Sequence, residues 1–98
     1  MNRAEHIATT AAEECNEVAQ RISKALRFGW EEVQPGQPLT NAERVAEEYR
    51  DLTAMMHMLV GEGLIQPDFA PNSQQIINKI SKVERFMQIG RDQGALTA

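Results

Sequence analysis

Apolar residues recur at helical spacing in three segments of the chain, and stretches containing glycine or proline separate these segments. In the first segment, Arg3 to Phe28, each residue advances about 100° around a predicted helix. One stripe of apolar side chains then forms a core face made of Ile7, Ala11, Cys15, Val18, Ile22 and Leu26. Asn2 is a suitable N-cap for this helix, and Gly29 would end it.

A loop and a second helix follow. Residues 30–39 contain two prolines and one glycine, which indicates a loop. Thr40, with Glu43 three residues later, matches a capping box and starts a helix that breaks at Gly61 and Gly63. Its predicted apolar positions are Val45, Leu52, Met56 and Leu59.

The third helix is predicted after a second proline-containing connection, residues 65–72. Asn72 or Ser73 would cap it, and Gly90 would end it. Four residues at helical spacing form its apolar stripe: Ile76, Ile80, Val83 and Met87.

These patterns predict an all-α protein with three main helices. No segment shows the sustained alternation of a strand. We expect a single domain over residues 1–90 and a flexible tail over residues 91–98. A chain this short buries only about 60% of its unfolded surface. Three helices would leave one apolar face uncovered, so we expect a four-helix-bundle type of core that is completed by oligomerisation.

Several carboxylates lie too close to the predicted core faces for an ordinary solvated surface. Glu14 falls about 60–80° from the centre of the first stripe, with Glu17 further round on the same side. Glu48 lies within about 40° of the apolar centre of the second helix, whereas Glu47 points to the far side. Asp51 follows Glu48 at i+3, so each of the two helices presents a carboxylate pair beside its packing face.

Four like charges brought together repel one another, and burial increases the cost. A hard divalent cation would remove this conflict, and oxygen ligands without histidine or cysteine suit Mg²⁺, with Mn²⁺ as an alternative. The competing interpretation is a chance coincidence of charged positions in a helical protein. A di-iron site requires a Glu-x-x-His pair, and neither His6 nor His57 has a glutamate three residues before it.

Charge and cysteine content narrow the partners and the compartment. The net charge of −4 argues against a nucleic-acid polymer as the main ligand. Cys15 is the one cysteine and cannot form an internal disulfide, which fits a reducing cytoplasm. No apolar run approaches the roughly 20 residues of a membrane span. The first residues also lack the apolar stretch of a secretory signal.

The motif Glu13-Glu14-Cys15-Asn16-Glu17, followed by Glu48-Tyr49-Arg50-Asp51, resembles the E-E-x-x-E and E-x-x-D signature of MazG-like proteins. These belong to the all-α nucleotide pyrophosphohydrolase superfamily. Residues 23–29 and Asn41 with Glu43-Arg44 are similar to the segments that accompany the two motifs in small single-domain members. The resemblance extends from about Ala11 to Met87. In the family a small residue often precedes the aspartate, whereas this sequence has Arg50 there. An arginine at this position could alter the pocket, and with it the substrate and the activity.

The resemblance implies hydrolysis of a nucleoside triphosphate to the monophosphate and pyrophosphate. It implies that Glu14, Glu17, Glu48 and Asp51 bind magnesium, and that Glu13 orients or deprotonates the attacking water. It also implies a homodimer or homotetramer. Phosphoribosyl-ATP pyrophosphohydrolase is an alternative within the superfamily, and a non-catalytic helical interaction module is the alternative outside it.

Further residues are candidates for substrate binding. Arg21 is placed close to Glu14 and Lys24 close to Glu17, where they could meet phosphates, balance the carboxylates or form ordinary i,i+4 pairs. The other candidates are Lys79 and Lys82 beside the third stripe, for phosphate, and Trp30, for stacking on a base. Solvated lysines and a packing tryptophan are the alternatives for these three.

Overall fold

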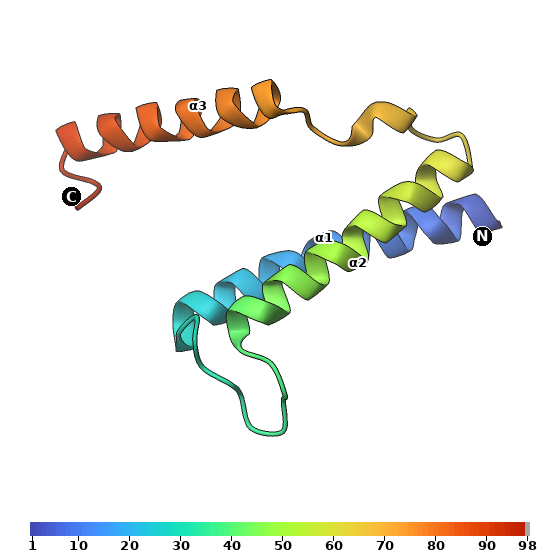
Figure 1. Cartoon of the computed structure of the whole chain (residues 1–98), viewed down its shortest axis with the longest axis horizontal. Helices are drawn as coiled ribbons and strands as arrows, with labels where there is room; N and C mark the ends of the chain where they lie inside the picture. Colours follow the sequence, from blue (N-terminus) through green and yellow to red (C-terminus); the bar gives the residue numbers. More distant parts are fainter. Residues whose placement is uncertain (98) are drawn as a thin grey trace. The chain divides into compact units, whose positions relative to one another are not determined.

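The computed structural model describes residues 1–97 and is all-helical over them. In chain order the elements are α1 (Arg3–Phe28), α2 (Asn41–Gly61), the short 3₁₀ helix η1 (Pro67–Phe69) and α3 (Ser73–Asp92), as Figure 1 shows. The predicted all-α class and the three main helices are confirmed. The third helix passes through Gly90 and ends two residues later than predicted. Ala98, the last residue of the predicted tail, lies outside the described residues.

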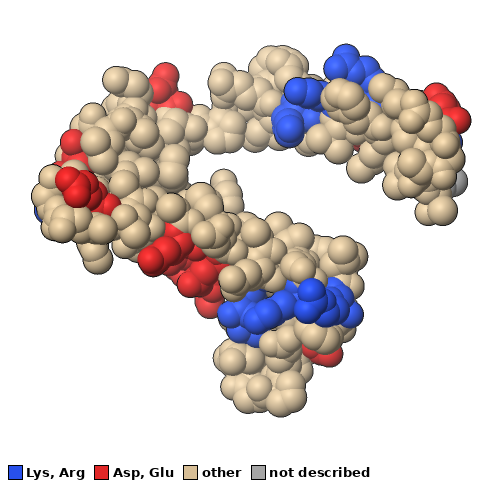
Figure 2. All heavy atoms as spheres, turned by 180° about the vertical axis from the view of Figure 1, so that it is seen from behind, with Lys and Arg blue, Asp and Glu red and all other residues tan. Residues whose placement is uncertain are grey.

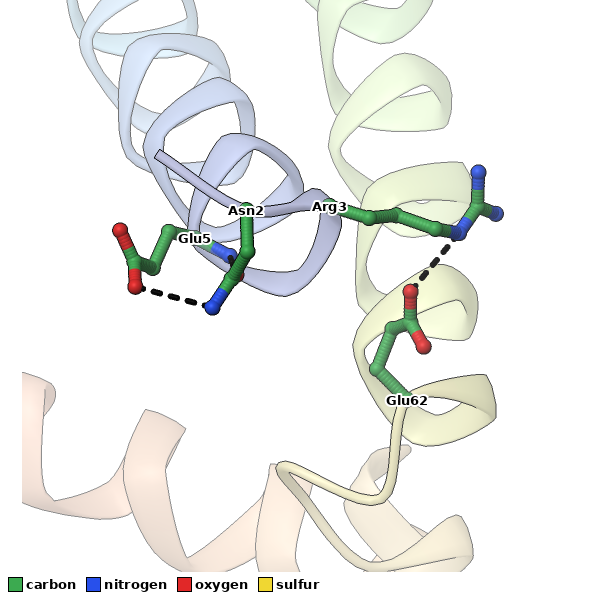
Figure 3. Close-up of polar contacts among 4 residues, drawn as sticks. All are labelled: Asn2, Arg3, Glu5 and Glu62. Atoms are coloured by element: carbon green, nitrogen blue, oxygen red, sulfur yellow. Dashed lines mark hydrogen bonds and ion pairs between the residues drawn. The ribbon is translucent and has the colours of Figure 1, made fainter.

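The helix ends follow the predicted capping signals. The Asn2 side chain accepts a hydrogen bond from the backbone N–H of Glu5 at 2.8 Å and donates one to the Glu5 carboxylate at 3.0 Å (Figure 3). Thr40 and Asn72 each form a complete capping box with the residue three positions later. Gly29 ends α1 with a positive φ of 107°, a conformation that side chains other than glycine rarely adopt.

The chain divides into two compact units, one ending at Pro67 and the other beginning at Asp68. The first unit is an antiparallel hairpin in which α1 packs on α2. At its open end, Arg3 Nε near the start of α1 lies 2.8 Å from Glu62 Oε1 just after α2 (Figure 3). The Arg3 side chain is 75% exposed and the Glu62 side chain 25% exposed, so solvent screening keeps the contribution of this ion pair to about 1 kcal/mol. The prediction of one domain over residues 1–90 stays a prediction.

The two helices of the hairpin meet along a seam, which we define as the buried and half-buried positions that recur every three or four residues. On α1 the seam consists of Ala4, Ile7, Ala11, Glu14, Val18, Arg21 and Ala25. On α2 it consists of Asn41, Val45, Glu48, Leu52, Met55 and Leu59, and Glu62 continues it just beyond the helix. This alternation of steps is the spacing of a coiled-coil contact. Charged side chains therefore share the seam with apolar ones.

Half of the stripe predicted for α1 does not face α2. Ile7, Ala11 and Val18 lie in the seam, but Cys15 is exposed, and Ile22 and Leu26 are 44% and 78% exposed. The prediction of Cys15 as a core residue is wrong. A single neighbouring helix covers only a narrow seam, so the apolar side chains on the adjacent face stay exposed in one chain.

The loop between α1 and α2 is held by the first residues of α2. The backbone N–H groups of Asn41 and Ala42 donate to the carbonyls of Glu32 and Trp30, both at 2.9 Å. Asn41 is only 3% exposed, and its side chain donates a hydrogen bond to the Gly29 carbonyl at 2.8 Å. The loop thereby satisfies backbone donors that the start of a helix leaves without partners. Asn41 thus fixes where α2 begins relative to the end of α1.

α3 is amphipathic and stands in the second unit. Its apolar stripe is exposed along the helix: Ile76 is 47%, Ile80 53%, Val83 39% and Met87 42% exposed. Within residues 1–97, no helix combines the length and the apolar character needed to cross a lipid bilayer.

We expect Asn41→Ala to lower the free energy of unfolding by about 0.5–1.5 kcal/mol, because the part-buried hydrogen bond to the Gly29 carbonyl is lost. Asn16→Ala is the matched control, since Asn16 is exposed on α1 and alanine is a better helix former. Urea titrations of both variants would measure the difference. Equal midpoints for the two variants would show that the Asn41 contact does not stabilise the hairpin.

Candidate metal centre

Three of the predicted metal ligands come together between α1 and α2. Glu14 and Glu17 of α1 and Glu48 of α2 each offer a carboxylate oxygen, and these oxygens lie within 4.8 Å of one another. Glu14 and Glu48 are half-buried, and Glu17 is exposed. We call these three residues the carboxylate cluster. The hairpin thus brings together groups that are separated by 31 residues along the chain, from 17 to 48.

The cluster forms because two glutamates occupy seam positions. Glu14 lies between Ala11 and Val18 on the seam of α1, and Glu48 lies between Val45 and Leu52 on that of α2. The sequence placed Glu14 on the shoulder of the stripe, whereas the structure places it in the line that faces α2. Side chains three residues apart on a helix are neighbours, so Glu17 reaches the same place from the outer side.

The remaining predicted carboxylates stay outside the cluster. Asp51 is exposed and lies one helical turn after Glu48, and its charge still acts on the Glu48 carboxyl. Glu13 is exposed on α1. Glu47, which the periodicity directed away from the site, is exposed as well.

The surroundings of Glu48 disfavour its charged form. Burial is the largest cause of a raised pKa for this carboxyl, followed by a hydrogen bond with Glu17 and then by the negative charges of Glu17, Glu14 and Asp51. A hydrogen bond between two carboxyl groups needs a proton on one of them. The Glu48 carboxyl, with its raised pKa, therefore retains a proton more readily than that of an isolated glutamate does.

One oxygen of the cluster is buried without a partner. Glu14 Oε2 has no hydrogen bond among the described residues, although its accessible surface is below 1 Å². A buried acceptor without a donor costs about 1–3 kcal/mol. A hard cation would satisfy this oxygen and would also offset the repulsion among the three charges. The all-oxygen donor set fits Mg²⁺ or Mn²⁺.

Arg21 of α1 lies across the seam from Glu48, the member of the cluster that belongs to α2. Arg21 Nε lies 3.9 Å from Glu48 Oε1, and the two side chains are only 22% and 13% exposed. The sequence placed Arg21 near Glu14, its neighbour on the same helix. Its partner across the seam was not predicted, because the register of two helices cannot be read from either one alone.

The other predicted substrate-binding residues lie on α1, just beyond its end and on α3. Lys24 is half-buried on α1, and Trp30 is 46% exposed just beyond its end. Lys79 and Lys82 are exposed on α3, in the second unit. Figure 2 shows acidic side chains gathered on the hairpin, with basic side chains beside them toward its loop end.

The raised pKa of Glu48 predicts how the metal-free protein responds to pH. A raised pKa in the folded state favours the protonated carboxyl, so this stabilisation is present below the ordinary glutamate pKa. It is lost as the pH rises through the raised pKa. We expect Glu48→Gln to be more stable than the parent protein at neutral pH in chelator, and to lose less stability between acid and neutral pH.

Glu47→Gln is the control for this test, since it removes a neighbouring exposed carboxylate. Urea midpoints measured across the acid-to-neutral range would compare the three proteins. Parallel pH curves for Glu48→Gln and the parent protein would contradict a raised pKa at Glu48.

No family model matches the chain, and comparisons with curated proteins and with solved structures give no match either. The carboxylate cluster and the sequence resemblance therefore carry the functional argument.

Proposed function

We propose that this protein is a Mg²⁺-dependent nucleotide pyrophosphohydrolase that converts a nucleoside triphosphate to the monophosphate and pyrophosphate. The observation that carries the proposal is the meeting of Glu14, Glu17 and Glu48 between the two helices, together with a Glu14 oxygen that is buried without a hydrogen-bond partner. The MazG-like arrangement of the motifs supports the substrate class. The single cysteine fits a protein of the reducing cytoplasm.

The three cluster residues would hold the cation, and Asp51 would join them from one turn further along α2. Mg²⁺ bound there would polarise a phosphoryl group and offset its negative charge. It would also offset the negative charge of the cluster itself, which otherwise repels a triphosphate. Mn²⁺ has a similar preference for oxygen ligands and would substitute for it.

The reaction adds water across the bond between the α and β phosphates. The water oxygen forms a new bond to the α phosphorus, the bond to the bridging oxygen breaks, and pyrophosphate leaves. Glu13 is exposed beside Glu14 in the sequence and would accept the proton that the water gives up. The proton then passes to solvent.

Basic residues would neutralise the phosphate charges. Arg21 and Lys24 follow the carboxylates along α1, and Lys79 or Lys82 of α3 would add a further charge. Trp30 is 46% exposed at the end of α1 and could stack on a base. In this assignment the carboxylates serve the cation, and the arginine and lysines serve the substrate.

Oligomerisation is part of the proposal. The buried apolar residues of the described chain are Ile7, Ala11 and Ala25, which make a very small core. The exposed face of α1 with Ile22 and Leu26, and the exposed stripe of α3, offer apolar surface to another copy. We propose a homodimer or a homotetramer whose helices form bundles of four.

We expect pyrophosphate, without free phosphate, to be released from one or more nucleoside or deoxynucleoside triphosphates in Mg²⁺ and not in chelator. Glu48→Gln and Asp51→Asn should lower kcat/KM by at least about 100-fold, since each removes a proposed ligand. Glu47→Gln is the matched control and should keep its activity, because its side chain is exposed outside the cluster.

Retained turnover in Glu48→Gln would rule out the catalytic assignment. Turnover of phosphoribosyl-ATP alone would select the alternative substrate within the superfamily. No turnover of any of these nucleotides, together with unchanged function in Glu48→Gln, would favour a non-catalytic helical interaction module.

For the oligomer, we expect Ile80→Glu to shift the mass in solution toward the monomer, because it puts a charge into the apolar stripe of α3. Asn78→Glu adds the same charge on the opposite side of the helix and should leave the mass unchanged. Light scattering coupled to gel filtration would measure both. A monomeric parent protein would contradict the proposal.

A further inference from the structure

One residue of the carboxylate cluster, Glu48, lies next to the positively charged side chain of Arg21. Arg21 occupies a seam position on α1, seven residues after Glu14 and four after Glu17. Its guanidinium meets Glu48 from the opposite helix, with 3.9 Å between Nε and Oε1. With side chains 22% and 13% exposed, both partners are largely withdrawn from solvent. Screening by water is therefore weaker here than at the Arg3–Glu62 pair, in which the Arg3 side chain is 75% exposed.

Arg21 offsets part of a negative charge that would otherwise be uncompensated. The charges that raise the pKa of the Glu48 carboxyl are those of Glu17, Glu14 and Asp51, all negative. The three carboxylates of the cluster and one guanidinium sum to about −2 when all are ionised. A divalent cation in place of the guanidinium would lower the negative charge further, to about −1.

The geometry of the Arg21–Glu48 contact would allow a metal ion to replace the guanidinium. At 3.9 Å the nitrogen and oxygen attract electrostatically but do not form a hydrogen bond, which needs about 2.7–3.2 Å. Displacing the guanidinium from Glu48 therefore breaks no short, directional bond. The arginine stem is long, so its head group can turn toward solvent while its methylene groups stay in the seam.

We propose that Arg21 is a positioning residue that serves as the counter-ion of Glu48 in the metal-free protein and is displaced when a divalent cation binds. Arg21 thereby sets the affinity of the site for the cation and stabilises the hairpin before the cation arrives. This inference rests on the metal centre of the proposed function. It differs from a direct role of Arg21 in binding phosphate, because it concerns the protein without substrate.

The test compares Arg21→Met with Arg27→Met in the full chain, without nucleotide. Both substitutions remove one positive charge from α1 and keep an unbranched side chain, but Arg27 is exposed and lies beside Phe28, with its guanidinium carbon 5.8 Å from the ring centre. Titration calorimetry with Mg²⁺ and with Mn²⁺ would measure the affinity of each protein. Melting followed by circular dichroism, in chelator and in saturating Mg²⁺, would measure stability.

We expect Arg21→Met to bind the cation about three- to tenfold more tightly than the parent protein, because the cation no longer competes with a partly buried ion pair. Its melting temperature in chelator should fall, and the rise produced by Mg²⁺ should exceed that of the parent protein. Arg27→Met should match the parent protein in affinity and in this rise. An Arg21→Met protein that is unfolded in chelator and folds in Mg²⁺ would also support the exchange.

Other outcomes would overturn the inference and identify what failed. If the parent protein binds the cation and Arg21→Met binds it equally well or more weakly, Arg21 does not have the proposed role. The proposed metal centre would remain supported in that case. An equal loss of stability with and without Mg²⁺ would mean that Arg21 only packs in the seam. Absence of binding by both proteins would reject the metal centre and the inference with it.

Discussion

The contact between α1 and α2 places charged and apolar side chains in one narrow seam, and the candidate site exists because of that contact. Glu14 and Arg21 on α1 and Glu48 on α2 take positions that Ile7, Val18 and Leu52 take elsewhere along the seam. Charges withdrawn from water are costly unless an opposite charge or a hydrogen bond compensates them. The Arg21 guanidinium offsets part of this cost in the hairpin, and the proposed metal ion would offset more of it.

Small side chains are the most deeply buried ones on the α1 side of the seam, together with Ile7. Ala11 and Ala25 are buried on the α1 side of the seam, and Ala25 is 0% exposed. The distance between packed helices depends on the size of the side chains between them. Small residues at these positions favour a short distance between the axes of α1 and α2. The same small residues bury little apolar area, which leaves the hairpin with limited hydrophobic stabilisation.

Along α1, after Arg3, acidic residues come before basic ones. This order favours the stability of the helix and fits the proposed chemistry. Acidic residues occupy its first two-thirds, as Glu5, Glu13, Glu14 and Glu17, and Arg21, Lys24 and Arg27 follow toward its end. Basic groups near a helix C-terminus interact favourably with the helix dipole. A triphosphate whose reacting group lay at the carboxylates could extend its other charges toward these cations. One helix would then supply both halves of the proposed binding surface, and α2 would supply Glu48 and Asp51.

Local signals along the chain were enough to predict the three helices and most of their ends. Asn2, Thr40 and Asn72 cap helices because their side chains reach backbone donors two or three residues away. Periodicity likewise singled out Glu48 over Glu47, since both lie on one helix and 100° separates neighbours. The third helix was predicted two residues too short, because Gly90 is tolerated inside a helix whose end is fixed further on, at Gln93 and Gly94.

The way in which α1 and α2 pack against each other could not be predicted from these local signals. Cys15, Ile22 and Leu26 share a stripe with Ile7, yet they stay exposed because α2 covers only the seam through Ala25. Arg21 meets Glu48 and not its helical neighbour Glu14. Both results depend on the rotation and register of α1 against α2. Periodicity within one helix carries information about its own faces, whereas register is a property of the packed pair of helices.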